Sequence, residues 1–202
     1  YQPNTKVLVT GFSRGAALGR RFVALIEKYL EESNQGTIEP FAYELMFDTV
    51  AAMGMPNMSR SSRPKSEVVF ENGCTLPKIV IKALHCVSLD DKRKAFQPTL
   101  MNHQPHVVEE TWFAGAHSDV GGGFYRDGLS NGVLEYALDW LDKTSIEVNY
   151  NTQPTALDLS CALPEGVSYV IGIDDVHLTP SALGKNHQQD RHPVLDWFTL
   201  DD

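Results

Sequence analysis

Val7-Leu-Val-Thr-Gly-Phe-Ser-Arg-Gly-Ala16 is the stretch of sequence on which the predicted fold depends. Its first four residues are apolar or β-branched, which predicts a short buried strand. The next five, Gly11 to Gly15, fit the pattern G-x-S-x-G around Ser13. A helical pattern follows from about Ala16 to Glu32. A strand, a glycine-flanked serine and a helix in this order form the context that a nucleophile elbow requires.

The predicted helix has an apolar repeat at i, i+3, i+4, i+7 and i+8, made by Phe22, Leu25, Ile26, Tyr29 and Leu30. This spacing predicts one apolar face at a 3.6-residue period. At the turn before it, Gly11 and Gly15 are expected to be small so that strand and helix can approach. Ser13 is expected in a strained backbone conformation, with its hydroxyl exposed at the helix N-terminus, where the dipole favours developing negative charge. The alternative is a glycine-rich βα turn in which the serine has no catalytic role.

Length and composition predict a single domain over residues 1–202, of which 144–202 form an irregular C-terminal extension. The net charge of −9 argues against nucleic acid and against bulk electrostatic attraction to anionic lipid. This charge does not exclude a lipid substrate that binds in a local apolar groove. The three cysteines form no disulfide or metal-binding pattern. We see no signal peptide and no membrane span, and the chain begins without Met just before a strand, as a fragment would.

A second strand is predicted at Phe41–Phe47, and Asp48 follows its carboxyl end. Working residues in an open α/β sheet lie at such ends, although a helix cap or turn would also suit an aspartate here. Met55 and Met58 follow in an apolar loop and could line an acyl-chain pocket, with ordinary core packing as the alternative.

Pro77 is expected to start a second helix, with Val80, Ala83, Leu84 and Val87 on one face. His85 on its flank is interpreted as a packed or capping histidine. Asp90 and Asp91 lie in the charged turn that follows. Either could be the acid of a catalytic site in place of Asp48, or both could simply be exposed to solvent.

A third strand, Val107–Phe113, is followed by His117, Asp119 and the glycines at 121–123. Successive glycines beside a histidine suggest a backbone that bends sharply next to a site. Asp119 could orient the imidazole of His117, but a buried turn-stabilising role fits it better because Asp48 occupies a better strand end. A surface histidine in a glycine-rich turn is the alternative for His117.

The rest of the chain predicts a helix capped by Ser130 and one more strand within Val167–Gly172. Histidines and aspartates recur after Asp174, but their spacing matches no metal-ligand pattern, so neither a metal nor a cofactor is expected.

Three strand ends therefore carry Ser13, Asp48 and His117, the chain order of the α/β-hydrolase arrangement. A histidine can take the proton of a serine hydroxyl, and a carboxylate can hold the imidazole in one tautomer. The backbone N–H of Arg14 is the expected oxyanion donor. Asp119 and Asp90 are secondary candidates for the acid.

Three blocks, Gly-Phe-Ser13-Arg-Gly-Ala, Phe-Asp48-Thr-Val and Trp-Phe-Ala-Gly-Ala-His117-Ser-Asp-Val-Gly-Gly-Gly-Phe, resemble the uncharacterised α/β-hydrolase domain family that includes type VI secretion phospholipase effectors. The block Ala95-Phe96-Gln97-Pro98 is also similar. The resemblance runs from about residue 6 to 142 and implies a Ser–Asp–His triad at the residues named above. It implies a mostly parallel sheet flanked by helices, here without the N-terminal strands and the loop that could supply a second oxyanion donor.

The sequence thus predicts a serine hydrolase of carboxylic esters, of the phospholipase or lipase type. The expected partners are a lipid or acyl-ester substrate, a peripheral membrane contact and, for a secreted effector, a cognate immunity protein. The chain would be cytoplasmic or exported without a signal peptide. Two other hypotheses stay open: an esterase or thioesterase for a soluble substrate, and a non-catalytic hydrolase-like interaction domain.

Overall fold

The computed structural model describes residues 5–33, 38–51, 76–93, 96–124, 126–148, 157–158, 170–171 and 178–187. Within them the elements in chain order are β1 (Val7–Phe12), α1 (Arg14–Glu32), β2 (Ala42–Phe47), β3 (Val80–Ser88), β4 (Val108–Phe113), α2 (His117–Gly121), α3 (Gly128–Lys143), β5 (Leu157–Asp158) and β6 (Val170–Ile171).

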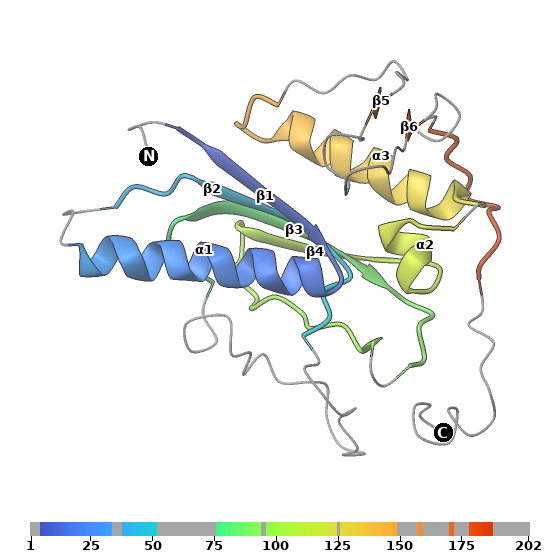
Figure 1. The fold of residues 1–202 in the computed structure, drawn as a ribbon, viewed down its shortest axis with the longest axis horizontal. Helices are drawn as coiled ribbons and strands as arrows, with labels where there is room; N and C mark the ends of the chain where they lie inside the picture. The colour runs from blue at the N-terminus through green and yellow to red at the C-terminus, as the bar shows by residue number, and fades with distance from the viewer. Residues whose placement is uncertain are drawn as a thin grey trace.

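The first four strands form one parallel sheet in the order β1-β2-β3-β4 (Figure 1). Because all four strands run the same way, their carboxyl ends lie at one edge of the sheet. This arrangement confirms the predicted α/β class with a mostly parallel sheet. β5 and β6 form a separate antiparallel pair, and β6 falls inside the strand predicted at Val167–Gly172.

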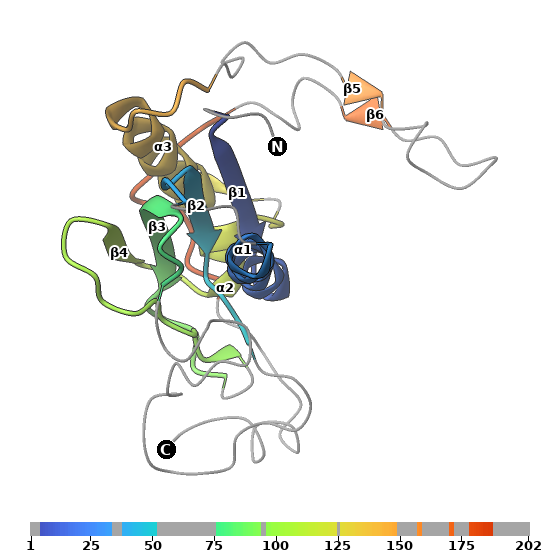
Figure 2. The same ribbon diagram turned by 90° about the vertical axis from the view of Figure 1, so that its left-hand side faces the viewer.

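Helices cover both faces of the sheet, α1 on one and α3 on the other (Figure 2). Side chains alternate across each strand, so Met46 and Ala83 pack toward α1, and Leu45 and Leu84 pack toward α3. Both faces of the central strands β2 and β3 are therefore mostly buried, as parallel sheets require. The sheet is thereby fixed as a rigid platform for the residues at its carboxyl edge.

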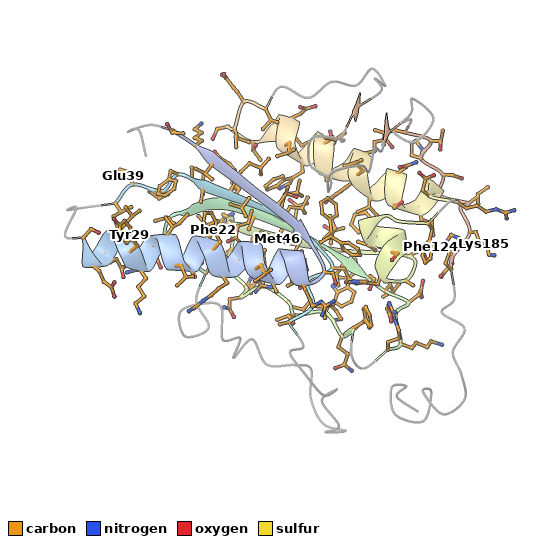
Figure 3. All side chains as sticks on the ribbon, viewed as in Figure 1. Phe22, Tyr29, Glu39, Met46, Phe124 and Lys185 are labelled. Atoms are coloured by element: carbon orange, nitrogen blue, oxygen red, sulfur yellow. The ribbon has the colours of Figure 1, made fainter. Side chains whose placement is uncertain are left out.

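The face that α1 buries differs from the predicted one. Phe22, Leu25 and Tyr29 are exposed at 53%, 44% and 68%, whereas Ile26 and Leu30 are partly buried. Figure 3 labels Phe22 and Tyr29 on α1. The buried face is made by Ala16, Ala17, Arg20, Val23, Ala24 and Glu27. The alanines and Val23 of this face let the helix lie close to the sheet, while the long side chains of Arg20 and Glu27 bind the backbone of Thr99 and Lys78.

Residues 80–88 form the strand β3, so the helix predicted to start at Pro77 is wrong. The strand is buried on both faces between β2 and β4, and such a strand reads as a nearly continuous apolar run. The apolar positions of a run like this also match a helical period over a short window. Val80, Ile81 and Val87 were the local signal for a strand, because β-branched residues favour one.

The segment after β4 also differs in detail. His117 begins the short helix α2 instead of standing in a turn, and only Gly122 and Gly123 of the three glycines have positive φ, at 85° and 111°. α3 starts at Gly128 with Asp127 at its N-cap, so Ser130 lies inside the first turn and its hydroxyl donates to the Asp127 carbonyl at 2.9 Å. Met55 and Met58 lie outside the described residues.

Candidate active site

Ser13 stands between β1 and α1 in the strained conformation that the sequence predicted, with φ 59° and ψ −125°. Its N–H donates to the carbonyl of Phe47 at 3.0 Å, which joins this turn to the end of β2. A Cβ on Gly11 would lie 2.7 Å from the Ala16 backbone N, so only glycine fits there. The same expectation was wrong for Gly15, where an added Cβ meets no atom within 4 Å among the described residues.

Asp48 follows β2 directly and is fully buried. Its backbone has a φ of 39°, which turns the chain at the edge of the sheet. Ser88, the last residue of β3, binds this carboxylate twice. Its N–H donates to Oδ1 at 2.9 Å and its hydroxyl donates to Oδ2 at 2.8 Å. These bonds offset part of the cost of burying the carboxylate.

The imidazole of His117 lies between Asp48 and Ser13. Its Nδ1 is 2.6 Å from Asp48 Oδ2, and its Nε2 is 2.8 Å from the hydroxyl oxygen of Ser13. A carboxylate can only accept, so in this arrangement Nδ1 carries the proton and Nε2 is free to accept from the serine. The structure therefore brings together the three side chains that the sequence predicted, separated by 104 positions at most.

Two aromatic rings enclose this imidazole. The ring centroid of Phe12 lies 4.4 Å from that of His117, and the Phe96 ring meets it edge-on at 5.0 Å. The guanidinium of Arg93 stacks on Phe96, 3.4 Å from its ring centroid. These contacts limit rotation of the imidazole and exclude water from its sides.

Asp91 supports the start of α2. Its Oδ2 accepts the backbone N–H of His117 at 3.3 Å, and its two oxygens accept from the Arg93 guanidinium at 2.6 to 3.1 Å. Burial acts to raise the pKa of this carboxyl, but the hydrogen bonds from Arg93 outweigh it and the pKa lies below its usual range. Asp91 is thus an ionised anchor for the His117 backbone and does not contact the imidazole nitrogens.

Asp90 and Asp119, the secondary candidates for the acid, are bound elsewhere. Asp90 Oδ2 accepts from Gly115 N–H at 2.7 Å and from the Asn186 amide at 2.8 Å. Asp119 Oδ2 accepts from the Ala116 and His187 backbone N–H groups, at 2.9 and 3.0 Å. Asp119 is buried, in line with the turn-stabilising role that the sequence favoured.

The segment 178–187 lies against α2 and α3 through these contacts. His187 Nδ1 is 2.6 Å from Asp119 Oδ1, and its ring stacks on that of Phe124 at 4.0 Å between centroids. Figure 3 labels Phe124 and Lys185 at this end of the molecule. Ser181 N–H also donates to the Gly128 carbonyl at 2.9 Å.

Sequence reasoning missed Ser88 and His187. The serine would have been found had residues 80–88 been recognised as a strand, because Ser88 then stands at a carboxyl end. His187 carries no local signal, because its partners Asp119 and Phe124 are more than 60 positions away.

Arg14 is the first residue of α1. The N–H groups of a first helical turn have no carbonyl partner in the helix, so the Arg14 N–H can bind an oxyanion next to Ser13. No cluster of His, Cys, Asp or Glu that could hold a metal ion occurs in the described part of the chain. Over the same residues, no helix has the length and hydropathy of a membrane span.

The fold and the edge residues define an α/β protein with a Ser–His–Asp constellation at the carboxyl ends of its strands. Residues 39–143 match the family described as "T6SS, Phospholipase effector Tle1-like, catalytic domain". This is just over half of the 202 residues. The chain belongs to this family.

The chain was also compared with solved structures and with curated proteins. Among solved structures, the chain is similar to an uncharacterized protein from Pseudomonas aeruginosa, with 24% sequence identity and a TM-score of 0.43. The similarity covers 67% of this chain and 23% of that protein, so the chain spans less than a quarter of its length. No curated protein matches the chain significantly.

Proposed function

We propose that this chain is the catalytic part of a serine hydrolase that cleaves acyl esters of phospholipids. Ser13 is the nucleophile, His117 the general base and acid, and Asp48 the group that orients His117. The backbone N–H of Arg14 is the oxyanion donor.

One observation carries the proposal: the hydrogen-bonded series from Asp48 through His117 to Ser13, with both distances under 3 Å. The two bonds involve opposite nitrogens of one imidazole, which is the geometry that proton transfer from a serine requires. The strained elbow at Ser13 and the buried, hydrogen-bonded carboxylate support the same roles. Membership of a phospholipase effector family supports the substrate class.

The reaction follows from this geometry. The Ser13 oxygen attacks the ester carbonyl carbon while His117 Nε2 takes the hydroxyl proton, and the imidazolium is stabilised by Asp48. The tetrahedral intermediate places its oxyanion at the Arg14 N–H. Collapse breaks the ester C–O bond, and His117 returns the proton to the departing alcohol. Water, activated by the same imidazole, then hydrolyses the acyl-enzyme and releases the fatty acid.

A fluorophosphonate probe tests the nucleophile. We expect labelling of the folded chain that disappears in Ser13→Ala and in His117→Ala and is kept in Ser33→Ala, a serine at the far end of α1. The exposed Ser33 hydroxyl donates to the Tyr29 carbonyl in its own helix, at 2.7 Å, which makes it a matched surface control. Folded wild-type protein that takes no label would instead indicate a non-catalytic interaction domain.

Phospholipid vesicles and short-chain p-nitrophenyl esters, assayed side by side, test the substrate class. Release of fatty acid from vesicles at a rate that exceeds ester hydrolysis supports a phospholipase. Activity on the soluble esters alone would identify an esterase of soluble substrates.

The effector family also suggests a setting for this activity. We propose export by a type VI secretion system and, in the producing cell, a cognate immunity protein that blocks the hydrolase. Co-purification of the chain with the product of a neighbouring gene, together with loss of fluorophosphonate labelling in that complex, tests the partner. Full labelling in the complex would oppose an inhibitory immunity protein.

A further inference from the structure

The backbone after Asp48 is tied to both neighbouring strand ends. We call residues Asp48–Ala51 the acid loop. The Asp48 N–H donates to the Cys86 carbonyl at 2.7 Å, and the Val50 N–H donates to the carbonyl of Ser13 at 3.2 Å. A shift of the acid loop would therefore move the carboxylate and the nucleophile elbow together.

Between these two bonds, the N–H of Thr49 is bound by a side chain. It donates to Nε2 of His85 at 3.0 Å. His85 lies on β3, is fully buried and stands opposite Met46 in the sheet register. Because a backbone N–H can only donate, Nε2 must be unprotonated, and the ring proton stays on Nδ1. His85 Nδ1 lies 3.2 Å from Glu110 Oε2 on β4, which can accept that proton.

The groups around His85 favour this neutral form. Burial is the largest influence and lowers the pKa of His85; the positive charge of Arg20 on α1 lowers it further. The hydrogen bond to Glu110 on β4, which is the second-largest influence, and the charges of Glu110 and Asp48 raise this pKa but do not outweigh burial and Arg20. The balance leaves the imidazole uncharged at neutral pH, so it can accept from Thr49.

The loop that leads into β4 meets the acid loop from the other side. Thr99 N–H donates to the Thr49 carbonyl at 2.7 Å, and the Thr99 carbonyl accepts from the buried Arg20 guanidinium at 2.6 Å. Glu110 Oε2 accepts the Met101 N–H at 3.0 Å. His85 thus lies in a buried network that reaches from α1 to β4 under the acid loop.

We propose that His85 is a positioning residue: its neutral imidazole anchors the Thr49 N–H and so keeps Asp48 aimed at His117 and Val50 bonded to Ser13. The proposal rests on the function proposed above for the Ser13, Asp48 and His117 set. His85 touches none of the reacting atoms, so its effect passes through the backbone of the acid loop.

The test compares His85→Leu, which removes the acceptor, with His85→Gln, whose side-chain oxygen can still accept. The matched control is His103→Gln, at an exposed histidine in the loop before β4. Each variant is assayed with a short-chain p-nitrophenyl ester, with rates divided by the number of fluorophosphonate-labelled sites. We expect His85→Leu to lower kcat by about 10- to 100-fold with KM changed less than about twofold, because misplacement of a catalytic group impairs the chemical step more than substrate binding. His85→Gln should recover part of the loss.

A second readout does not depend on hydrolysis. The proton between His117 Nδ1 and Asp48 is expected as a low-field resonance in the ¹H NMR spectrum of the wild type. It should shift or broaden in His85→Leu, shift less in His85→Gln and stay unchanged in His103→Gln.

Unchanged kcat per labelled site and an unchanged resonance in His85→Leu would overturn the proposal. If His85→Leu does not fold, His85→Phe, which keeps a planar ring but also lacks the acceptor, takes its place, and wild-type values of both quantities in that variant would equally exclude a positioning role. Wild-type protein that neither hydrolyses esters nor takes the probe would refute the proposed function alone, and the resonance would still report on His85.

Discussion

The hydroxyl of Ser88 donates to Asp48 Oδ2 at 2.8 Å, and this oxygen is the same one that lies 2.6 Å from His117 Nδ1. The end of β3 therefore sets the direction in which the carboxylate faces the imidazole. A carboxylate with two well-placed donors besides the histidine has little freedom to rotate. The catalytic geometry that we propose thus depends on a residue outside the Ser–His–Asp set.

Ser88→Ala should lower kcat by about tenfold. The variant loses the hydroxyl bond but keeps the backbone bond from Ser88 N–H to Asp48 Oδ1, so the carboxylate is held less firmly rather than released. Hydrogen bonds to charged groups contribute about 1.5–3 kcal/mol, and we expect the free energy of unfolding to fall within that range. Ester hydrolysis and urea denaturation measure the two effects, with Ser33→Ala as the control. A wild-type kcat in Ser88→Ala would show that the backbone bond suffices.

Asp48→Asn should lose about four orders of magnitude in kcat, because an amide that donates to Nδ1 favours the wrong imidazole tautomer. Asp119→Asn should keep kcat within about tenfold, because Asp119 is bonded to Ala116 and His187. Its main effect should be a loss of stability of about 1–3 kcal/mol, seen in thermal or urea unfolding. The opposite ranking of the two kcat values would make Asp119 the acid.

Gly121→Ala should impair both folding and activity. A Cβ at this position would lie 2.1 Å from the ring of Phe12, which packs on His117. Overpacking of this kind costs about 1–3 kcal/mol. Gly132→Ala, inside α3, is the matched comparison: no described atom lies within 4 Å of the added Cβ, and we expect stabilisation by about 0.4–1 kcal/mol. Equal unfolding midpoints for the two variants would refute this assignment of Gly121.

The thiol of Cys86 should resist alkylation in the native state. Burial, and to a smaller extent the charge of Glu109, raise the pKa of Cys86 to about 12. Iodoacetamide reacts with the thiolate, so at pH 8 we expect a rate on the order of a thousandfold below that of a free cysteine. Replacing Cys74 and Cys161 by serine leaves Cys86 as the only thiol. Fast labelling that needs no denaturant would show that β3 is accessible.

The pH dependence of stability should carry a contribution from His85. The pKa of this group is lowered in the folded protein, so the unfolded chain binds more protons between the lowered value and about 6.5. The free energy of unfolding should therefore rise with pH through this window and level off above it. His85→Gln removes this part of the slope, which urea denaturation at several pH values measures against His103→Gln. Parallel curves for wild type and His85→Gln would contradict a buried neutral imidazole.

Several features could be read from the sequence because their signals are local. The elbow at Ser13 combines a β-branched strand, small neighbours and a helical repeat within a short window. Asp48 and His117 each follow a predicted strand, and parallel strands place their carboxyl ends at one edge.

The features that the tertiary structure alone decided depend on what packs against a segment. Whether residues 80–88 form a helix or a strand is settled by burial between β2 and β4, since their apolar run suits both. The face of α1 that meets the sheet combines alanines and Val23 with the buried, hydrogen-bonded Arg20 and Glu27, and leaves the larger apolar area of Phe22 and Tyr29 exposed. The roles of Ser88, His85 and His187 arise from contacts across the sheet or with a distant segment. Such contacts cannot be predicted from the periodicity of apolar residues along the chain.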